Sequence, residues 1–196
     1  MSSPGIGRIR VVAEQRREPL VPSGVMGMLI FSFTELMLFA GLISAFTIIR
    51  SSSVVWPPPG QPRLPFEATA FNTAVLLLSG AALIWTRRTF DRNRAAARTP
   101  LVVAIALGAF FVVVQGAEWV AMIRQGLTLT SSTLGGFFYL AVGLHALHAI
   151  AALALLGVTL RRLRRGWLAS SQLGTAEVLW YFVVAVWPFL WLVLYR

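Results

Sequence analysis

Four ionisable side chains stand deep inside long apolar stretches of the sequence: Glu35, Glu118, His145 and His148. Glu35 is the single charged residue in residues 24–49. Helix rise places it, like the two histidines, near the middle of its stretch, whereas Glu118 stands nearer to one end. A charged side chain at the centre of a bilayer costs on the order of a few kcal/mol, so these residues are the first candidates for a functional role.

The spacing of the two histidines limits the ways in which they could bind a haem or a metal ion. His145 and His148 are three residues apart, so they lie on one face of a helix and cannot hold a haem from both sides. The sequence contains no third histidine. A haem with one histidine ligand and a metal site shared with Glu118 stay open, although a carboxylate-bridged di-iron site needs repeated Glu-x-x-His pairs. The simplest interpretation is a polar cluster that packs helices together.

Glu35 has a functional and a structural interpretation. A carboxyl group in the middle of a membrane often belongs to a proton path. The sequence offers no second carboxyl group at that depth, so a structural, hydrogen-bonded role is the alternative. The groups that could compensate Glu35 are a proton of its own, the hydroxyls of Thr34 and Ser32, a histidine in residues 134–160, or a group on a partner protein.

The composition predicts an integral membrane protein of the all-α class. Hydrophobic residues make up 57% of the chain and charged residues 12%, against about 25% charged residues in a typical soluble domain. Each apolar run has about 20 residues or more, which suits membrane-spanning helices and is too long for the strands of a β-barrel. We expect an N-terminal tail, residues 1–23, and a bundle of five transmembrane helices, residues 24–196. The predicted spans are residues 24–49, 66–86, 100–123, 134–160 and 175–195.

The arginines predict that the N-terminus is cytoplasmic and the C-terminus lies outside. Thirteen of the seventeen arginines fall in the N-terminal tail and in the second and fourth connections, and positively charged loops stay on the cytoplasmic side. The net charge of +10 therefore belongs to membrane loops, and we expect no nucleic-acid partner.

The absence of cysteine removes thiolate metal sites and cysteine nucleophiles. No internal repeat is visible, which argues against a transporter built from paired halves.

Two further sets of residues have structural interpretations. Small and short polar residues in membrane helices form close contacts and hydrogen bonds between helices, whereas aromatic residues near span ends contact lipid or a partner. The expected helix-packing residues are Gly41, Asn72, Thr73, Ser79 and Gly80, and the expected lipid or interface residues are Trp56, Trp119, Tyr181 and Trp187.

Five segments of the chain, in the same order, resemble subunit III of haem-copper terminal oxidases, the cytochrome c oxidase subunit 3 family. Glu35 takes the position of the buried carboxyl group of that family, and Glu118, His145 and His148 match its other ionisable positions. The matching segments are FSFTELMLFAGL (31–42), LPFEATAFNTAVLLLSG (64–80), QGAEW (115–119), FFYLAVGLHALHAIAALALL (137–156) and VLWYFVVAVWPFLWLVLY (178–195).

Four positions depart from the family pattern. Thr34 replaces the usual serine before the buried carboxyl group, and Ala146 replaces the glycine after the first histidine. In the last segment, Tyr181 stands where the family usually has histidine and Val184 where it has aspartate. The last span is therefore poorer in polar groups than is usual in the family.

The resemblance implies a non-catalytic subunit III in the short, five-helix bacterial form, located in the bacterial plasma membrane. Such a chain would carry no cofactor itself. Haem and copper would belong to the catalytic subunit I and to subunit II, which reduce O2 and pump protons. Its role would be to pack on subunit I, to bind phospholipid, and to support proton uptake and sustained turnover. The alternatives are an accessory subunit of a quinol oxidase or nitric oxide reductase and, from another class, a small proton-coupled transporter that uses Glu35.

Overall fold

Five long helices make up the part of the chain that the computed structural model describes, residues 21–52 and 66–195. All five are long and apolar enough to cross a membrane, and the described residues form no strand. The predicted all-α bundle of five membrane-spanning helices is therefore confirmed. The helices are α1 (Ser23–Ser52), α2 (Phe66–Arg92), α3 (Arg98–Arg124), α4 (Thr133–Arg164) and α5 (Ser170–Leu194).

The helices extend beyond the apolar runs at the arginine-rich end of the bundle. Helix α2 continues to Arg92, past the predicted end at residue 86, and α5 begins at Ser170 rather than at residue 175. Arginine is a good helix former, and its long side chain can reach water while its backbone stays helical, so a change in hydropathy does not end the helix.

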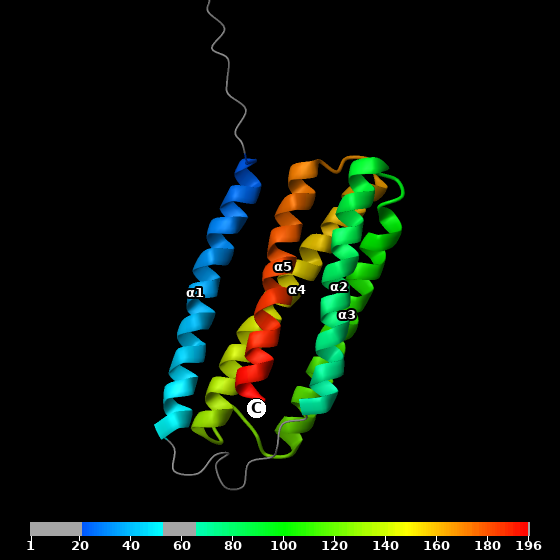
Figure 1. Ribbon diagram of the computed structural model, residues 1–196. Coiled ribbons are helices and arrows are strands. Elements are labelled where there is room, and N and C mark those ends of the chain that lie inside the picture. Colours follow the sequence, from blue (N-terminus) through cyan, green and yellow to red (C-terminus); the bar gives the residue numbers. More distant parts are fainter. Residues whose placement is uncertain (1–20, 53–65, 196) are drawn as a thin grey trace, which may run out of the picture.

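Helix α5 occupies the centre of the bundle and α1 its edge (Figure 1). Helix α5 packs against α1, α2 and α4, whereas among the described helices α1 packs only against α5 and α4. Only three side chains of α1 are buried within this chain: Ser32, Phe39 and Phe46. Large apolar side chains such as Phe33 and Met37 stay exposed on α1. This edge helix therefore offers a broad apolar surface to lipid or to another subunit.

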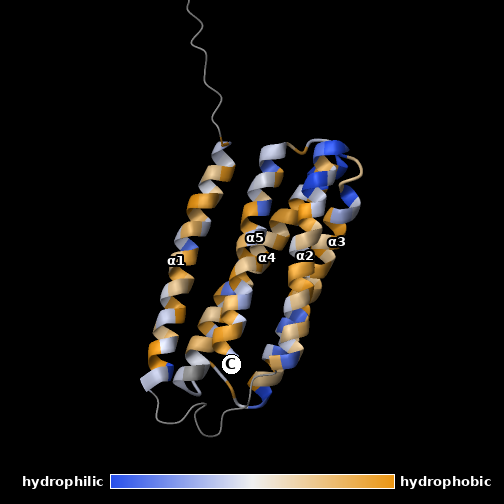
Figure 2. Ribbon diagram, viewed as in Figure 1, coloured by the Kyte–Doolittle hydropathy of each residue, from blue (hydrophilic) through white to orange (hydrophobic). Residues whose placement is uncertain are grey.

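The connections α2–α3 and α4–α5 lie at the same end of the bundle as the start of α1 (Figure 1). The connection α3–α4 and the end of α5 lie at the opposite end. Colouring by hydropathy shows the densest group of hydrophilic residues at the first end, on α2 and α3, with further hydrophilic residues near the other end of these two helices (Figure 2). The arginines of the second and fourth connections are thus brought together at one end.

Two tryptophan side chains of α5 join α5 to α2 and α3 through buried hydrogen bonds. The Trp180 indole donates to Ser79 Oγ at 3.1 Å, and the Ser79 hydroxyl donates to the backbone carbonyl of Ala104 at 2.7 Å. The Trp187 indole donates to Thr73 Oγ1 at 2.9 Å. Since unpaired polar groups are costly in a membrane, these bonds fix how the three helices pack.

Glycines allow close packing where α5 meets its neighbours. A Cβ atom at Gly108 of α3 would lie 2.5 Å from the Trp180 ring, closer than real Cβ atoms approach. A Cβ atom at Gly80 of α2 would lie 3.1 Å from Val184. Val184 occupies the position where the family usually has aspartate, so an apolar contact replaces a polar group there.

Candidate functional site

The carboxyl group of Glu35 on α1 meets the imidazole of His148 on α4. Glu35 Oε2 and His148 Nε2 lie 3.3 Å apart, and the two side chains are 19% and 10% exposed. His148 Nδ1 lies 2.8 Å from the carbonyl oxygen of Leu144. A carbonyl oxygen only accepts hydrogen bonds, so Nδ1 carries a hydrogen and Nε2 faces the carboxyl group.

Glu35 Oε2 forms no hydrogen bond with the described residues, so the 3.3 Å approach to His148 is a polar contact between two side chains that can each hold a proton. A low-dielectric environment favours the uncharged form of such a pair, with the proton on Glu35, over an imidazolium beside a carboxylate. His148 is therefore the group that compensates Glu35 within this chain.

Aromatic rings surround the Glu35–His148 pair. The His148 ring lies 5.8 Å from the Phe39 ring and 5.7 Å from the Phe182 ring, both edge-on, and 6.0 Å from the Phe31 ring. These apolar rings limit the access of water and strengthen the interaction between the two polar groups. Among the other proposed partners of Glu35, the Thr34 hydroxyl donates instead to the carbonyl of Phe31 at 2.7 Å.

Glu118 belongs to a second, separate polar cluster near the end of α3. Thr69 Oγ1 and Gln115 Nε2 both donate to Glu118 Oε2, at 3.0 Å and 2.9 Å. Gln115 Nε2 also lies 3.0 Å from the hydroxyl of Tyr195, and Asn72 Nδ2 donates to Gln115 Oε1 at 3.2 Å. The cluster joins α2, α3 and the residue after α5, where burial raises the pKa of the Tyr195 hydroxyl.

His145 lies apart from both clusters. It is 1% exposed, and neither of its ring nitrogens has a hydrogen-bond partner among the described residues. The rings of Trp187, Phe39 and Phe111 lie 5.0, 6.3 and 6.5 Å from its centre. The structure therefore places Glu118, His145 and His148 in three different environments, and it brings no three metal-ligating side chains together among the residues that it describes.

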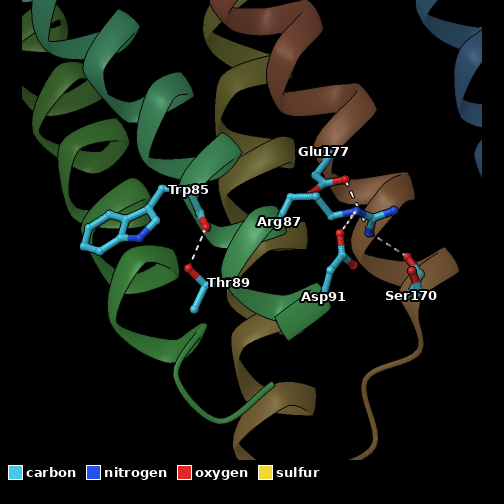
Figure 3. Close-up of polar contacts among 6 residues, drawn as sticks. All are labelled: Trp85, Arg87, Thr89, Asp91, Ser170 and Glu177. Carbon is cyan, nitrogen blue, oxygen red and sulfur yellow. Dashed lines mark hydrogen bonds and ion pairs between the residues drawn. The ribbon is translucent and has the colours of Figure 1, made fainter. Parts of the chain in front are cut away.

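An ion pair at the arginine-rich end was not predicted as a site from the sequence. Arg87 of α2 points toward α5, where its Nη1 lies 3.6 Å from Glu177 Oε2 and donates to the carbonyl of Ser170 at 3.3 Å (Figure 3). Arg87 Nε also lies 3.8 Å from Asp91 Oδ2. Glu177 is 7% exposed, so its carboxyl group is buried beside a cation. The signal in the sequence was a lone acidic residue opposite an arginine at the same end of two spans.

The structure places the predicted packing residues in two kinds of surroundings. Asn72, Thr73, Ser79 and Gly80 are buried between helices, and the three polar ones form the hydrogen bonds described above, with Asn72 Nδ2 also donating to Phe111 O at 3.1 Å. Gly41 is different, because it is exposed and an added Cβ atom would meet nothing within 4 Å. The prediction of a helix contact at Gly41 is therefore wrong within this chain.

The predicted lipid or interface residues differ in how far they are buried. Trp187 is completely buried, so the prediction that it contacts lipid is wrong; its indole N–H finds Thr73 inside the bundle. Trp119 and Tyr181 are half-buried, at the edges of separate hollows in the surface. Trp56 lies outside the described residues.

Fold and site together define a multi-pass membrane protein with a Glu–His pair held between an edge helix and the rest of the bundle. The family model for cytochrome c oxidase subunit III matches residues 14–196. Similar proteins are the cytochrome c oxidase subunits 3 of Pelomedusa subrufa, 34% identical over 179 residues, and of Rattus norvegicus, 32% identical over 191 residues. These matches cover 86% and 90% of this chain, and 67% and 71% of the two relatives. The chain belongs to the cytochrome c oxidase subunit III family.

Proposed function

We propose that this chain is a non-catalytic subunit of a respiratory haem-copper oxidase of the cytochrome c oxidase type. It packs on the catalytic subunit I, with subunit II in the same complex, binds lipid, and supports proton uptake and sustained turnover during O2 reduction. The observation that carries the proposal is the contact of Glu35 with His148, since a carboxyl group beside an imidazole in the middle of a span suits a position beside a proton path.

The chain's own histidines support placing haem and copper in the partner subunits. His148 is engaged at both ring nitrogens, by Leu144 and by Glu35. His145 is surrounded by aromatic rings and lies on the same helix, so the two imidazoles do not face each other across the space that a haem needs. The two histidines do not fit a haem held from both sides, and we assign redox chemistry to the partners.

Helix α1 supplies the surface that we assign to the partner and to lipid. It carries Glu35, and most of its apolar side chains are exposed on the surface of the bundle. A contact of α1 with subunit I would hold the Glu–His pair close to that subunit. Phospholipid would cover the remainder of the apolar surface.

The distribution of arginines supports an orientation with the N-terminus in the cytoplasm of a bacterial cell and the C-terminus outside. The second and fourth connections lie together at the end of the bundle where α1 begins (Figure 2). Positively charged connections of this length stay on the cytoplasmic side of the plasma membrane.

Oxygen consumption by the purified complex, with and without this chain, tests the proposed role. Loss of the chain is expected to leave the initial rate nearly unchanged and to shorten the time over which the complex stays active. An unchanged lifetime would contradict a supporting role in turnover. Comparing reduced cytochrome c, quinol and nitric oxide as substrates separates the cytochrome c oxidase type from a quinol oxidase or a nitric oxide reductase.

A further inference from the structure

A cavity between α3, α4 and α5 is not used by the function proposed above. Its volume is about 180 Å³. Its lining is apolar and aromatic, including Phe111, Trp119 and Trp187, and no arginine, aspartate or glutamate contributes to it. Ile150 stands at its edge and is 55% exposed, so the cavity reaches the lipid-facing surface of the bundle.

His145 and the Trp119 indole are the polar groups of this cavity that form no hydrogen bond with the described residues, and His145 is the only one of the two that can accept as well as donate. Both of its ring nitrogens lack a partner among the described residues, although the side chain is buried almost completely. Gln115 also lines the cavity, but its amide is already engaged by Glu118, Tyr195 and Asn72. A buried imidazole without partners is costly, and a ligand that satisfies it recovers that cost.

The chemistry of the lining selects the class of ligand. A charged molecule finds no opposite charge in the cavity, so the ligand is neutral. A neutral imidazole has one donor and one acceptor nitrogen, either of which pairs with a hydroxyl group. The aromatic side chains favour an aromatic ring in offset or edge-to-face contact. A cavity of about 150 Å³ is known to hold benzene, so the volume suits a single ring.

We propose that this cavity binds a neutral aromatic ring that carries a hydroxyl group, a phenol-class molecule dissolved in the bilayer. The hydroxyl pairs with His145 and the ring lies among the aromatic side chains. The ring enters from the lipid at Ile150, between α3 and α4. The Phe39 ring lies between this site and the Glu35–His148 pair, since it contacts both His145 and His148. The inference does not depend on the proposed role in an oxidase.

Titration of the full chain in lipid nanodiscs with 4-fluorophenol, followed by ¹⁹F NMR, tests the proposal. We expect saturable binding to the wild type and weaker binding of 4-fluorotoluene, which has the same shape without the hydroxyl. His145→Phe keeps a ring but removes the hydrogen bond, and we expect 4-fluorophenol to bind about fivefold more weakly.

Gly116→Leu fills the cavity without a backbone clash, because a Cβ atom at Gly116 meets nothing within 4 Å, and it is expected to abolish saturable binding. Gly157→Leu is the matched control, since Gly157 is equally open and lies outside the cavity lining. We expect this variant to bind 4-fluorophenol with the affinity of the wild type. Identical titrations of the wild type and Gly116→Leu would overturn the proposal. No saturable binding to the wild type, or equal affinities for 4-fluorophenol and 4-fluorotoluene, would overturn it as well.

Discussion

Glu35 and His148 come from different helices, and each supplies what the other needs. The carboxyl group needs a partner at mid-membrane depth, and the imidazole, fixed by the carbonyl of Leu144, presents its second nitrogen to that carboxyl group. With one proton between them, the pair carries no net charge.

Glu35→Gln tests whether that proton matters for function. The amide keeps the size and neutrality of the protonated acid but cannot release a proton, so we expect assembly to be intact. Turnover of the complex should slow, or its active lifetime should shorten, most clearly at high pH where proton uptake is limiting. The measurement is oxygen consumption by wild type and variant from about pH 6 to about pH 9. Identical kinetics over that interval would reduce Glu35 to a packing group.

The stability of the pair can be measured with His148→Phe and Glu35→Leu. His148→Phe leaves the carboxyl group without its partner, and we expect a loss of about 1–3 kcal/mol of unfolding free energy. Adding Glu35→Leu removes the stranded carboxyl group, and most of the loss should be recovered, because replacing both partners by apolar groups is often nearly neutral. Thermal unfolding in detergent gives both values. Additive losses in the double variant would show that the two residues do not interact.

The need for a partner of Glu35 could be predicted from the sequence, but the choice among partners could not. His145 and His148 are at similar depths and on one side of α4, so helix rise does not distinguish them. The rotation of α4 relative to α1 decides that His148 meets Glu35 while His145 lies among aromatic rings. That rotation depends on side-chain packing across the whole bundle.

At the level of helices, α5 holds the bundle together because it packs against α1, α2 and α4 and its tryptophan side chains also reach α3. Trp187 was predicted as a lipid or interface residue, but both it and Trp180 are completely buried. Apolar residues cover all sides of a membrane helix, so the sequence pattern does not reveal which side faces lipid. The buried hydroxyls of Thr73 and Ser79 were the better guide, since each had to find a partner on another helix.

Gly108 and Gly116, both on α3, provide a matched test of the contact with α5. Gly108→Ala places a methyl group against the Trp180 ring, and we expect a loss of about 1–3 kcal/mol from overpacking. Gly116→Ala meets no neighbour, so stability should stay equal or rise by up to about 1 kcal/mol. Thermal unfolding of the two variants in the same detergent measures the difference. Equal melting temperatures would contradict the close approach of Trp180 to α3.

At the level of the whole molecule, the charge distribution predicts which end faces the cytoplasm. The wild-type chain contains no cysteine, so single cysteines report orientation without background. In intact cells, a membrane-impermeant maleimide should label Thr130→Cys in the α3–α4 connection. It should label Arg94→Cys in the α2–α3 connection only after the membrane is opened. Labelling of Arg94→Cys but not of Thr130→Cys in intact cells would show the opposite topology.

The fold was the most predictable part of the molecule, because five long apolar runs leave few alternatives. The family could also be predicted, since several short motifs occur in the expected order. The ion pair of Arg87 with Glu177 could not be predicted as a contact, because it depends on how the ends of α2 and α5 meet (Figure 3).

Isolation of the native protein from its membrane in a mild detergent tests the central claim most directly. We expect a haem-bearing subunit to accompany the chain, with reduced-minus-oxidised haem bands in the visible spectrum and with subunits I and II among the purified proteins. A preparation of the intact chain without a haem-bearing partner would contradict the proposed place of this chain in an oxidase.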